Sequence, residues 1–271
     1  MDDLALVMRL AEKVRDATLD HVARGEDVAG IVRRRPRDVT RRIDMVAEEA
    51  LDAAIAGEGI AARVVSEELG QRVVPGGSEP ECTLLLDPVD GSNNLVAGIP
   101  YFCASLALSR KTDRATFGDL GAAAVASASC GTFTAAKGCG AFHDGRRIRA
   151  GPSGEKPVYA VYAYGAGAMP PGLIALQERD CIVRTMGSIA LDICMVARGS
   201  FDAVVDTREK VSGYDIMAGG LILREAGGAI GMADGRSLDA LPVETGGISI
   251  VAASYAGLYD RLVTIVNIQK P

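Results

Sequence analysis

The sequence is poor in aromatic residues and in histidine. Of its 271 residues none is tryptophan, 4% are aromatic, and two are histidine, His21 and His143. A core without large rings must be filled by Ala, Val, Leu and Ile. We interpret both histidines as surface or packing residues, so we do not expect catalysis by histidine.

The cysteines also lack a pattern. The six of them form no C-x-x-C pair, and several have apolar neighbours. This favours buried free thiols in a reducing compartment over a disulfide or zinc framework. The residues concerned are Cys82, Cys103, Cys130, Cys139, Cys181 and Cys194.

Long apolar runs and excess positive charge are absent as well. No uncharged apolar run reaches the roughly 18 residues of a membrane span, and the N-terminus lacks the features of a secretion signal. We therefore expect a cytoplasmic protein with no membrane partner. A net charge of −6 and a pI near 5.1 argue against a nucleic-acid partner. A hydrophobic content of 48% indicates a well-filled core, enough for one large domain or two packed halves.

Hydrophobic periodicity predicts a mixed first half. Leu4, Val7, Ala11 and Val14 predict a helix over 3–23, and a second helix is expected from near Val39 to residue 57. Between them, the arginine run 33–35 is interpreted as a solvated loop, with a phosphate-attracting lid as the alternative. Strands are expected over 63–66, 83–86, 102–109 and 121–127, followed by a hairpin or meander over 132–149.

After Gly151 helices and strands alternate. Strands are predicted over 158–162, 182–185, 203–205 and 248–252, and helices over 171–178, 188–197, 214–225 and 255–268. We therefore divide the chain into an antiparallel-rich α+β half, 1–150, and an α/β half, 151–271.

The most informative motif follows the apolar run 84–86. A buried strand ends in Asp87-Pro88-Val89-Asp90, and Gly91-Ser92 follows where a helix would begin. Proline stiffens the link, so both carboxylates lie near the carboxyl end of the strand, where α/β folds bind ligands. Clustered oxygen ligands suit Mg²⁺, and free N–H groups at a helix start suit a phosphate. The motif indicates phosphoryl chemistry.

Other acids gain meaning only beside this motif. Glu67 and Glu68 end a strand, Asp215 opens an apolar helix, and Asp44 lies on the second helix. Taken alone, the Glu67-Glu68 pair would be interpreted as a solvated strand end, Asp215 as an acid at a helix N-terminus, and Asp44 as part of a polar helix face. Their order around the central motif favours a shared site.

Three motifs together resemble the inositol monophosphatase family of Mg²⁺-dependent, Li⁺-sensitive phosphatases, which includes certain fructose-1,6-bisphosphatases. They are Ser66-Glu67-Glu68, Asp87-Pro88-Val89-Asp90-Gly91-Ser92 and Tyr214-Asp215-Ile216-Met217-Ala218-Gly219. The resemblance implies a layered α-β-α-β-α sandwich and a phosphomonoester hydrolase. Two departures are Tyr214, where the family usually has Trp, and a longer spacing from Asp206 to Asp215 than in animal members. The segment 201–208 instead resembles archaeal-type members, which tend to hydrolyse both fructose 1,6-bisphosphate and inositol 1-phosphate.

The resemblance also implies the metal ligands. Two or three Mg²⁺ ions would be held by the side chains of Glu67, Asp87, Asp90 and Asp215 and the carbonyl of Val89. Glu68 would reach a metal only through water.

Hydrolysis by this family implies an in-line attack on phosphorus by a metal-activated water. The Ser92 hydroxyl, oriented by Asp44, and the Glu67 carboxylate would position and deprotonate that water, and Thr40 would steady Asp44. The N–H groups of Gly91 and Ser92 would cradle the phosphate.

Substrate contacts are also carried over from the archaeal-type members. They are expected from Arg184, Ile189 and Arg208, together with Asp90, Gly91 and Ser92. A guanidinium suits a second phosphate, and Tyr164 is a further candidate to face the sugar. Alternative functions are a 3′(2′),5′-bisphosphate nucleotidase of the same family and a non-catalytic metal-binding relative. Family members are commonly dimers, so a homodimer is expected.

Overall fold

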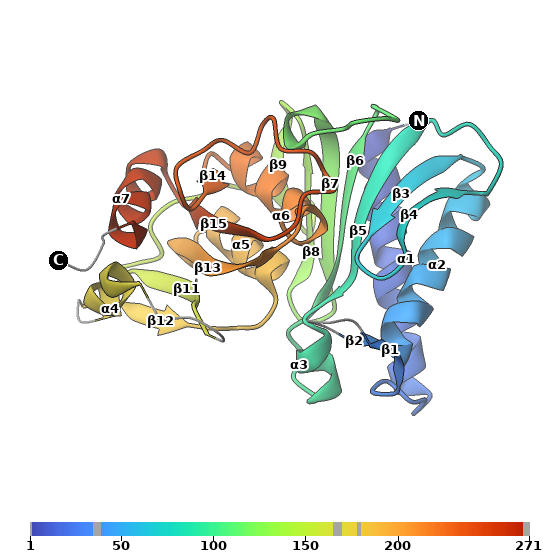
Figure 1. Cartoon of the computed structure of the whole chain (residues 1–271), viewed down its shortest axis with the longest axis horizontal. Coiled ribbons are helices and arrows are strands. Elements are labelled where there is room, and N and C mark those ends of the chain that lie inside the picture. Colours follow the sequence, from blue (N-terminus) through green and yellow to red (C-terminus); the bar gives the residue numbers. More distant parts are fainter. Residues whose placement is uncertain (1, 35–38, 165–169, 178–179, 268–271) are drawn as a thin grey trace.

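The computed structural model describes residues 2–34, 39–164, 170–177 and 180–267. Helices and sheets alternate in the order α-β-α-β-α across the molecule (Figure 1), which confirms the expected layered sandwich. Helices α1 and α2 form one outer layer, and α4 and α7 lie at the opposite end.

Helix α1 (Asp3–Ala23) has the predicted bounds. Its buried stripe of Leu6, Val7, Leu10 and Val14 packs toward α2 and the larger sheet, as the apolar spacing requires. Helix α2 (Arg42–Glu58) begins later than expected. The residues assigned to its start form β2 (Val39–Arg41), which pairs with β1 (Ile31–Arg34) in a separate two-stranded sheet. Of the arginine run 33–35, Arg33 and Arg34 lie in β1 and not in a loop, and residue 35 lies outside the described residues.

The larger sheet has eight strands in the order β10-β9-β8-β7-β6-β5-β3-β4. Only the β3–β5 pair is parallel, and the 132–149 meander is confirmed. Because β3 and β5 run the same way, their carboxyl ends meet, and the Glu67 N–H donates to the Leu86 carbonyl at 3.2 Å. The strands are β3 (Ala62–Ser66), β4 (Gly70–Val74), β5 (Cys82–Asp90), β6 (Cys103–Ser109), β7 (Leu120–Ser127), β8 (Gly131–Ala136), β9 (Gly140–His143) and β10 (Arg146–Ile148).

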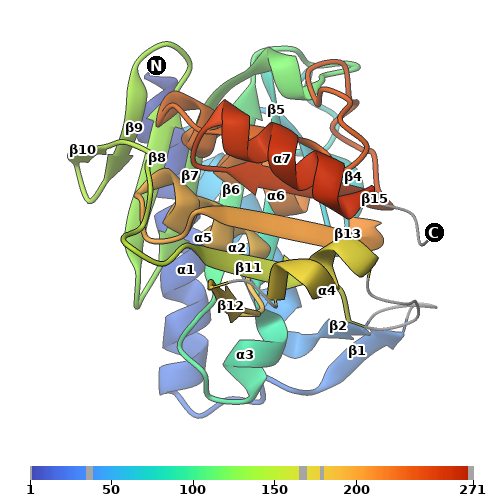
Figure 2. The same cartoon turned by 90° about the vertical axis from the view of Figure 1, so that its left-hand side faces the viewer.

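The smaller sheet has five strands in the order β12-β11-β13-β15-β14. Its strands are β11 (Val158–Tyr162), β12 (Ile182–Arg184), β13 (Ala203–Val211), β14 (Ala229–Met232) and β15 (Ile248–Ala253). Helices α4 (Pro171–Gln177) and α7 (Ala256–Val266) lie on its outer side (Figure 2). The expected ends of these helices, residues 178 and 268, lie outside the described residues. Strands β4 and β14 were not predicted.

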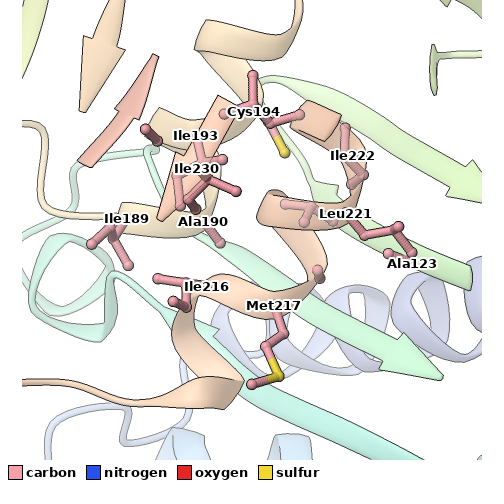
Figure 3. Close-up of a cluster of buried hydrophobic side chains, with 14 of the residues drawn as sticks. Ala123, Ile189, Ala190, Ile193, Cys194, Ile216, Met217, Leu221, Ile222 and Ile230 are labelled. Carbon is pink, nitrogen blue, oxygen red and sulfur yellow. The ribbon is translucent and has the colours of Figure 1, made fainter. Parts of the chain in front are cut away.

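Helices α5 (Ile189–Ala197) and α6 (Gly213–Glu225) lie between the two sheets. They are buried on nearly every side, and Figure 3 shows their aliphatic side chains packed together. A side chain at Gly219 would lie 3.1 Å from the Ala190 carbonyl, so glycine lets the two helices approach closely. One apolar cluster includes residues of both sheets, so the two halves share a core. The division of the chain at residue 150 stays a prediction.

All six cysteines are free thiols, as predicted, but only Cys82, Cys103 and Cys194 are buried, while Cys139 is exposed. Among the described residues, no helix has the length and apolar character needed to cross a bilayer.

Candidate active site

The central motif continues the buried strand β5 beyond its expected end. Residues Asp87, Val89 and Asp90 are all buried, and the Val89 N–H donates to Asp87 Oδ1 at 3.1 Å. Gly91 then turns the chain into the short helix α3 (Ser92–Val96) with φ +96°. A Cβ at Gly91 would stand 2.9 Å from the Tyr101 carbonyl, so both conformation and space require glycine there.

Three acids from separate elements meet beside this turn. Glu67 follows β3, Asp87 lies in β5, and Asp215 lies in the first turn of α6. Each offers a carboxylate oxygen, and the three oxygens lie within 4.8 Å of one another. Asp215 also accepts the Ser212 N–H at 2.7 Å, so it caps its helix while joining the cluster. Among the described residues, this is the one group of acids, cysteines or histidines close enough to hold a metal ion.

Electrostatics in this cluster favour a bound cation. Burial raises the pKa of Asp87 well above its usual value, and the nearby carboxylates of Glu67 and Asp90 raise it further. Burial likewise raises the pKa of Asp215 to about 8. Within the described ranges, neither acid has an ion-pair partner, and the positive charge of Arg208 lowers the Asp215 pKa only in part. A cation among the three carboxylates would relieve this repulsion.

Asp90 was expected to bind a metal ion, and in the structure its carboxylate accepts hydrogen bonds from the start of α5. Its carboxylate accepts the Ser188 hydroxyl and the Ala190 N–H, both at 2.7 Å, and the Ile189 N–H at 3.2 Å. Burial raises the Asp90 pKa to about 6, although these hydrogen bonds lower it. Asp90 therefore ties the larger sheet to the start of α5. Its predicted role as a metal ligand stays a prediction, and it lies outside the three-carboxylate group.

The predicted water-positioning residues are close by. Asp44 is buried at the start of α2, where it accepts the Arg41 N–H at 2.6 Å and adds to the repulsion felt by Asp87. The Thr40 hydroxyl donates to Glu68 Oε2 at 2.5 Å, a partner that the sequence did not predict. The catalytic roles of Asp44, Glu67 and Ser92 stay predictions.

The cluster opens into a cleft of about 600 Å³, a volume usual for a small-molecule site. Its walls come from both sheets and from the loops at their ends. They comprise Val39, Glu67, Glu68, Asp87, Val89, Asp90, Gly91, Ser92, Asn93, Tyr162, Tyr164, Gly187, Ile189, Arg208, Glu209, Lys210, Ser212, Tyr214, Asp215 and Gly247.

The predicted substrate residues separate into two groups. Ile189 and Arg208 line the cleft, but Arg184 is not among the described residues that do. Arg184 ends the edge strand β12, is exposed, and donates to the neighbouring Val183 carbonyl at 3.0 Å. The geometry gives no support to a substrate contact for Arg184, which stays an untested prediction.

Sequence reasoning missed an aromatic group around Arg208. The guanidinium stands 4.7 Å from the ring centres of both Tyr162 and Tyr164. It donates to Tyr164 Oη at 2.6 Å and, through Nε and Nη2, to Asp206 Oδ2 at 3.0 and 2.6 Å. The Tyr162 hydroxyl in turn donates to the buried Asp192 at 2.6 Å. Asp192, a lone acid in an apolar helix, was the one available signal of this network.

Comparisons with known proteins agree with this arrangement. Residues 3–269 match the model of the inositol monophosphatase family. A fructose-1,6-bisphosphatase of Pyrococcus furiosus is 34% identical over 85% of this chain and 84% of its own. A fructose-1,6-bisphosphatase/inositol-1-monophosphatase of Methanothermobacter thermautotrophicus is 30% identical over 97% and 96%. The structure of a Thermotoga maritima IMPase, 26% identical, superposes with a TM-score of 0.79 over 98% of this chain and 97% of that one. The chain therefore belongs to the inositol monophosphatase family.

Proposed function

We propose that this protein is a Mg²⁺-dependent phosphatase of small sugar and cyclitol phosphates, acting on fructose 1,6-bisphosphate and inositol 1-phosphate. The observation that carries the proposal is the meeting of Glu67, Asp87 and Asp215 at the base of a cleft of substrate size. Family membership and the names of the archaeal relatives support the substrate class.

The residues present fit a hard divalent cation. All the clustered donors are oxygens, and burial together with nearby carboxylates raises the pKa values of Asp87 and Asp215. Glu67, Asp87 and Asp215 would hold the metal, with Asp90 and the Val89 carbonyl as further ligands for a second or third ion. When bound, Mg²⁺ supplies Lewis acidity and neutralises the charge of the phosphoryl oxygens.

The protein's own groups would bind the phosphate, orient the attacking water and accept its proton. The N–H groups of Gly91 and Ser92 would bind the phosphate oxygens, and the Ser92 hydroxyl would orient a water in line with the leaving oxygen. The Glu67 carboxylate would accept the proton that this water loses as its oxygen bonds to phosphorus and the ester P–O bond breaks. Asp90 holds Ser188 and Ile189 in place on the substrate side of the cleft.

A panel of esters tests this proposal. Phosphate release should be measured from fructose 1,6-bisphosphate, inositol 1-phosphate and 3′-phosphoadenosine 5′-phosphate, each with Mg²⁺ and with excess chelator. We expect turnover of the first two esters that the chelator abolishes. Preference for the adenosine ester would support the nucleotidase alternative, and no turnover of any ester would contradict the proposal. The homodimer and the cytoplasmic location remain untested predictions.

A further inference from the structure

A bulge in β13 enlarges one wall of the cleft. Asp206 pairs with Ile250, and the next pair joins Val211 to Ile248, so residues 207–210 face the single residue Ser249 of β15. Within the bulge Glu209 adopts φ +54°, which non-glycine residues rarely do, and its N–H donates to Ser249 Oγ at 3.1 Å. This bulge lies within the long spacing between Asp206 and Asp215 that the sequence analysis noted.

The bulge brings the two cations of the described cleft lining, Arg208 and Lys210, to the same wall. Arg208 is already balanced, because two of its N–H groups and its own backbone N–H are donated to Asp206, which is fully buried. A third N–H goes to Tyr164. Two of the five guanidinium N–H groups remain for a ligand, but the ion pair brings no net positive charge.

Lys210 differs from Arg208 in having no such partner. Its ammonium makes no hydrogen bond or ion pair with any residue in the described part of the chain, and its side chain is exposed at the cleft. The other ionisable groups lining the cleft, apart from the tyrosines, are carboxylates, and Glu209 is exposed beside Lys210. Lys210 is therefore the one cation of the described lining whose charge no ion pair balances.

Burial separates the two ends of the cleft. The carboxylates of Asp87 and Asp90 lie on its buried floor. The exposed lining residues form its rim, and they are Asn93, Tyr164, Gly187, Glu209, Lys210 and Gly247. A phosphate under hydrolysis must lie against the floor, where the metal-binding carboxylates are. A second phosphate on the same sugar would extend toward the rim and meet the ammonium of Lys210.

We propose that Lys210 binds the phosphate that is not cleaved, and so favours bisphosphate over monophosphate esters. The inference rests on the proposed phosphatase function and adds a specificity-determining residue to it. An ammonium is a point charge that suits a phosphate without fixed geometry. Arg208 contributes hydrogen bonds from a neutral ion pair, while Lys210 contributes charge.

The test compares kcat/KM for fructose 1,6-bisphosphate with kcat/KM for inositol 1-phosphate. In Lys210→Met, we expect the ratio to fall roughly tenfold, as expected for the loss of one charge-assisted phosphate contact. Lys210→Arg keeps the charge and should hold the ratio within about twofold of the wild-type value. Glu209→Gln removes the neighbouring negative charge and should raise the ratio. Lys137→Met makes the same substitution away from the cleft, where the ammonium donates to the Gly118 carbonyl, and is the matched control.

Each outcome bears on the inference. A ratio in Lys210→Met equal to that in Lys137→Met would overturn it, and so would an equal loss for both esters, which would place Lys210 on the reacting phosphate. A fall of the ratio in Glu209→Gln would show that the bulge, not its charge, sets the preference, and would also overturn it. Failure of the proposed function is seen separately, since the wild-type protein would then release phosphate from neither ester.

Discussion

Two groups of wholly or partly buried carboxylates lie beside the turn after β3, and their charges are balanced in different ways. Glu48 of α2 is fully buried and pairs with Arg72 at 2.7 Å. Asp87 is buried and Asp215 is partly buried, and both lie close to other acids, yet neither has an ion-pair partner among the described residues. In the first group the chain provides the opposing charge, and in the second the opposing charge must come from solution.

The two groups are physically linked. Glu48 Oε1 accepts the Leu69 N–H at 3.4 Å, and Arg72 donates to Ser66 Oγ at 2.9 Å. The Glu48–Arg72 pair therefore holds both sides of the turn that carries Glu67 and Glu68. An isolated buried charge is costly, so a fold retains uncompensated acids only where they are supported and used. The balanced pair stabilises the turn from which the unbalanced cluster is built.

The largest expected effect comes from Asp87→Asn. Removing this carboxylate should lower kcat/KM for inositol 1-phosphate in Mg²⁺ at least about a hundredfold, because a metal ligand acts on both the nucleophile and the leaving group. In the absence of metal, the same variant should unfold at higher denaturant than the wild-type protein, since one repelling charge is gone. Phosphate-release kinetics and urea titrations in chelator measure the two effects.

Asp20→Asn is the matched control for this variant, because Asp20 is exposed on α1 and away from the cleft. It should leave both quantities near their wild-type values. A metal-free Asp87→Asn protein less stable than the wild type would mean that Asp87 stabilises the fold, and the contrast between the two groups would fail.

Arg72→Met tests the balanced group. The substitution removes the positive charge that balances Glu48. We therefore expect the free energy of unfolding to fall by about 3 kcal/mol, as for other buried pairs that lose one partner. Unfolding of this variant in urea should be compared with that of the double variant Glu48→Gln/Arg72→Met, which removes the orphaned charge and should regain part of the loss. Arg9→Met, at a more exposed ion pair with Glu58, should have a smaller effect. If the double variant were less stable than Arg72→Met, the unpaired charge of Glu48 would not be what destabilises the single variant.

The raised pKa values of the acids in the cleft predict how stability depends on pH. Burial raises the pKa of Asp90 to about 6 and that of Asp215 to about 8, both above the value of about 4 in an unfolded chain. An acid whose pKa is higher in the folded state than in the unfolded chain favours folding while it is protonated. That stability is fully present below the pKa of the unfolded chain and is lost as the pH rises through the pKa of the folded state. Without metal, the free energy of unfolding should therefore fall by on the order of 5 kcal/mol between pH 5 and pH 8.

Mg²⁺ should remove most of that decrease, because it binds the ionised carboxylates of the folded state. Urea titrations at several pH values, with chelator and with Mg²⁺, measure both curves. A metal-free protein whose stability increases from pH 5 to pH 8 would contradict the directions of these pKa shifts.

The acids of the unbalanced group could be predicted from sequence, whereas the balancing contacts could not. Glu67, Asp87 and Asp215 lie in local motifs whose residue types and order indicate a metal site, and the helix over 3–23 follows from local spacing. Val39 was assigned to a helix because its pairing with the preceding strand β1 was not predicted, and the bulge after Asp206 was missed because it depends on pairing with the distant strand β15.

Side-chain partners are equally non-local. Asp90 meets Ser188, 98 residues further along the chain, and Tyr101 meets Asp192, 91 residues further. No periodicity in the sequence records such contacts. The substrate contact of Arg184 was expected from the resemblance to archaeal-type members and stays an untested prediction; in the structure Arg184 is exposed at the end of the edge strand β12.

The smallest predicted effect separates the two carboxylates that share Arg72. Asp52 accepts from Arg72 at 2.7 Å, as Glu48 does, but its side chain is 36% exposed while that of Glu48 is fully buried. Water can replace the contact at Asp52, so Asp52→Asn should cost less than about 1 kcal/mol of unfolding free energy, measured in the same urea titrations as Arg72→Met. A cost equal to that of Arg72→Met would mean that the ion pair itself, rather than the burial of Glu48, determines stability at this turn.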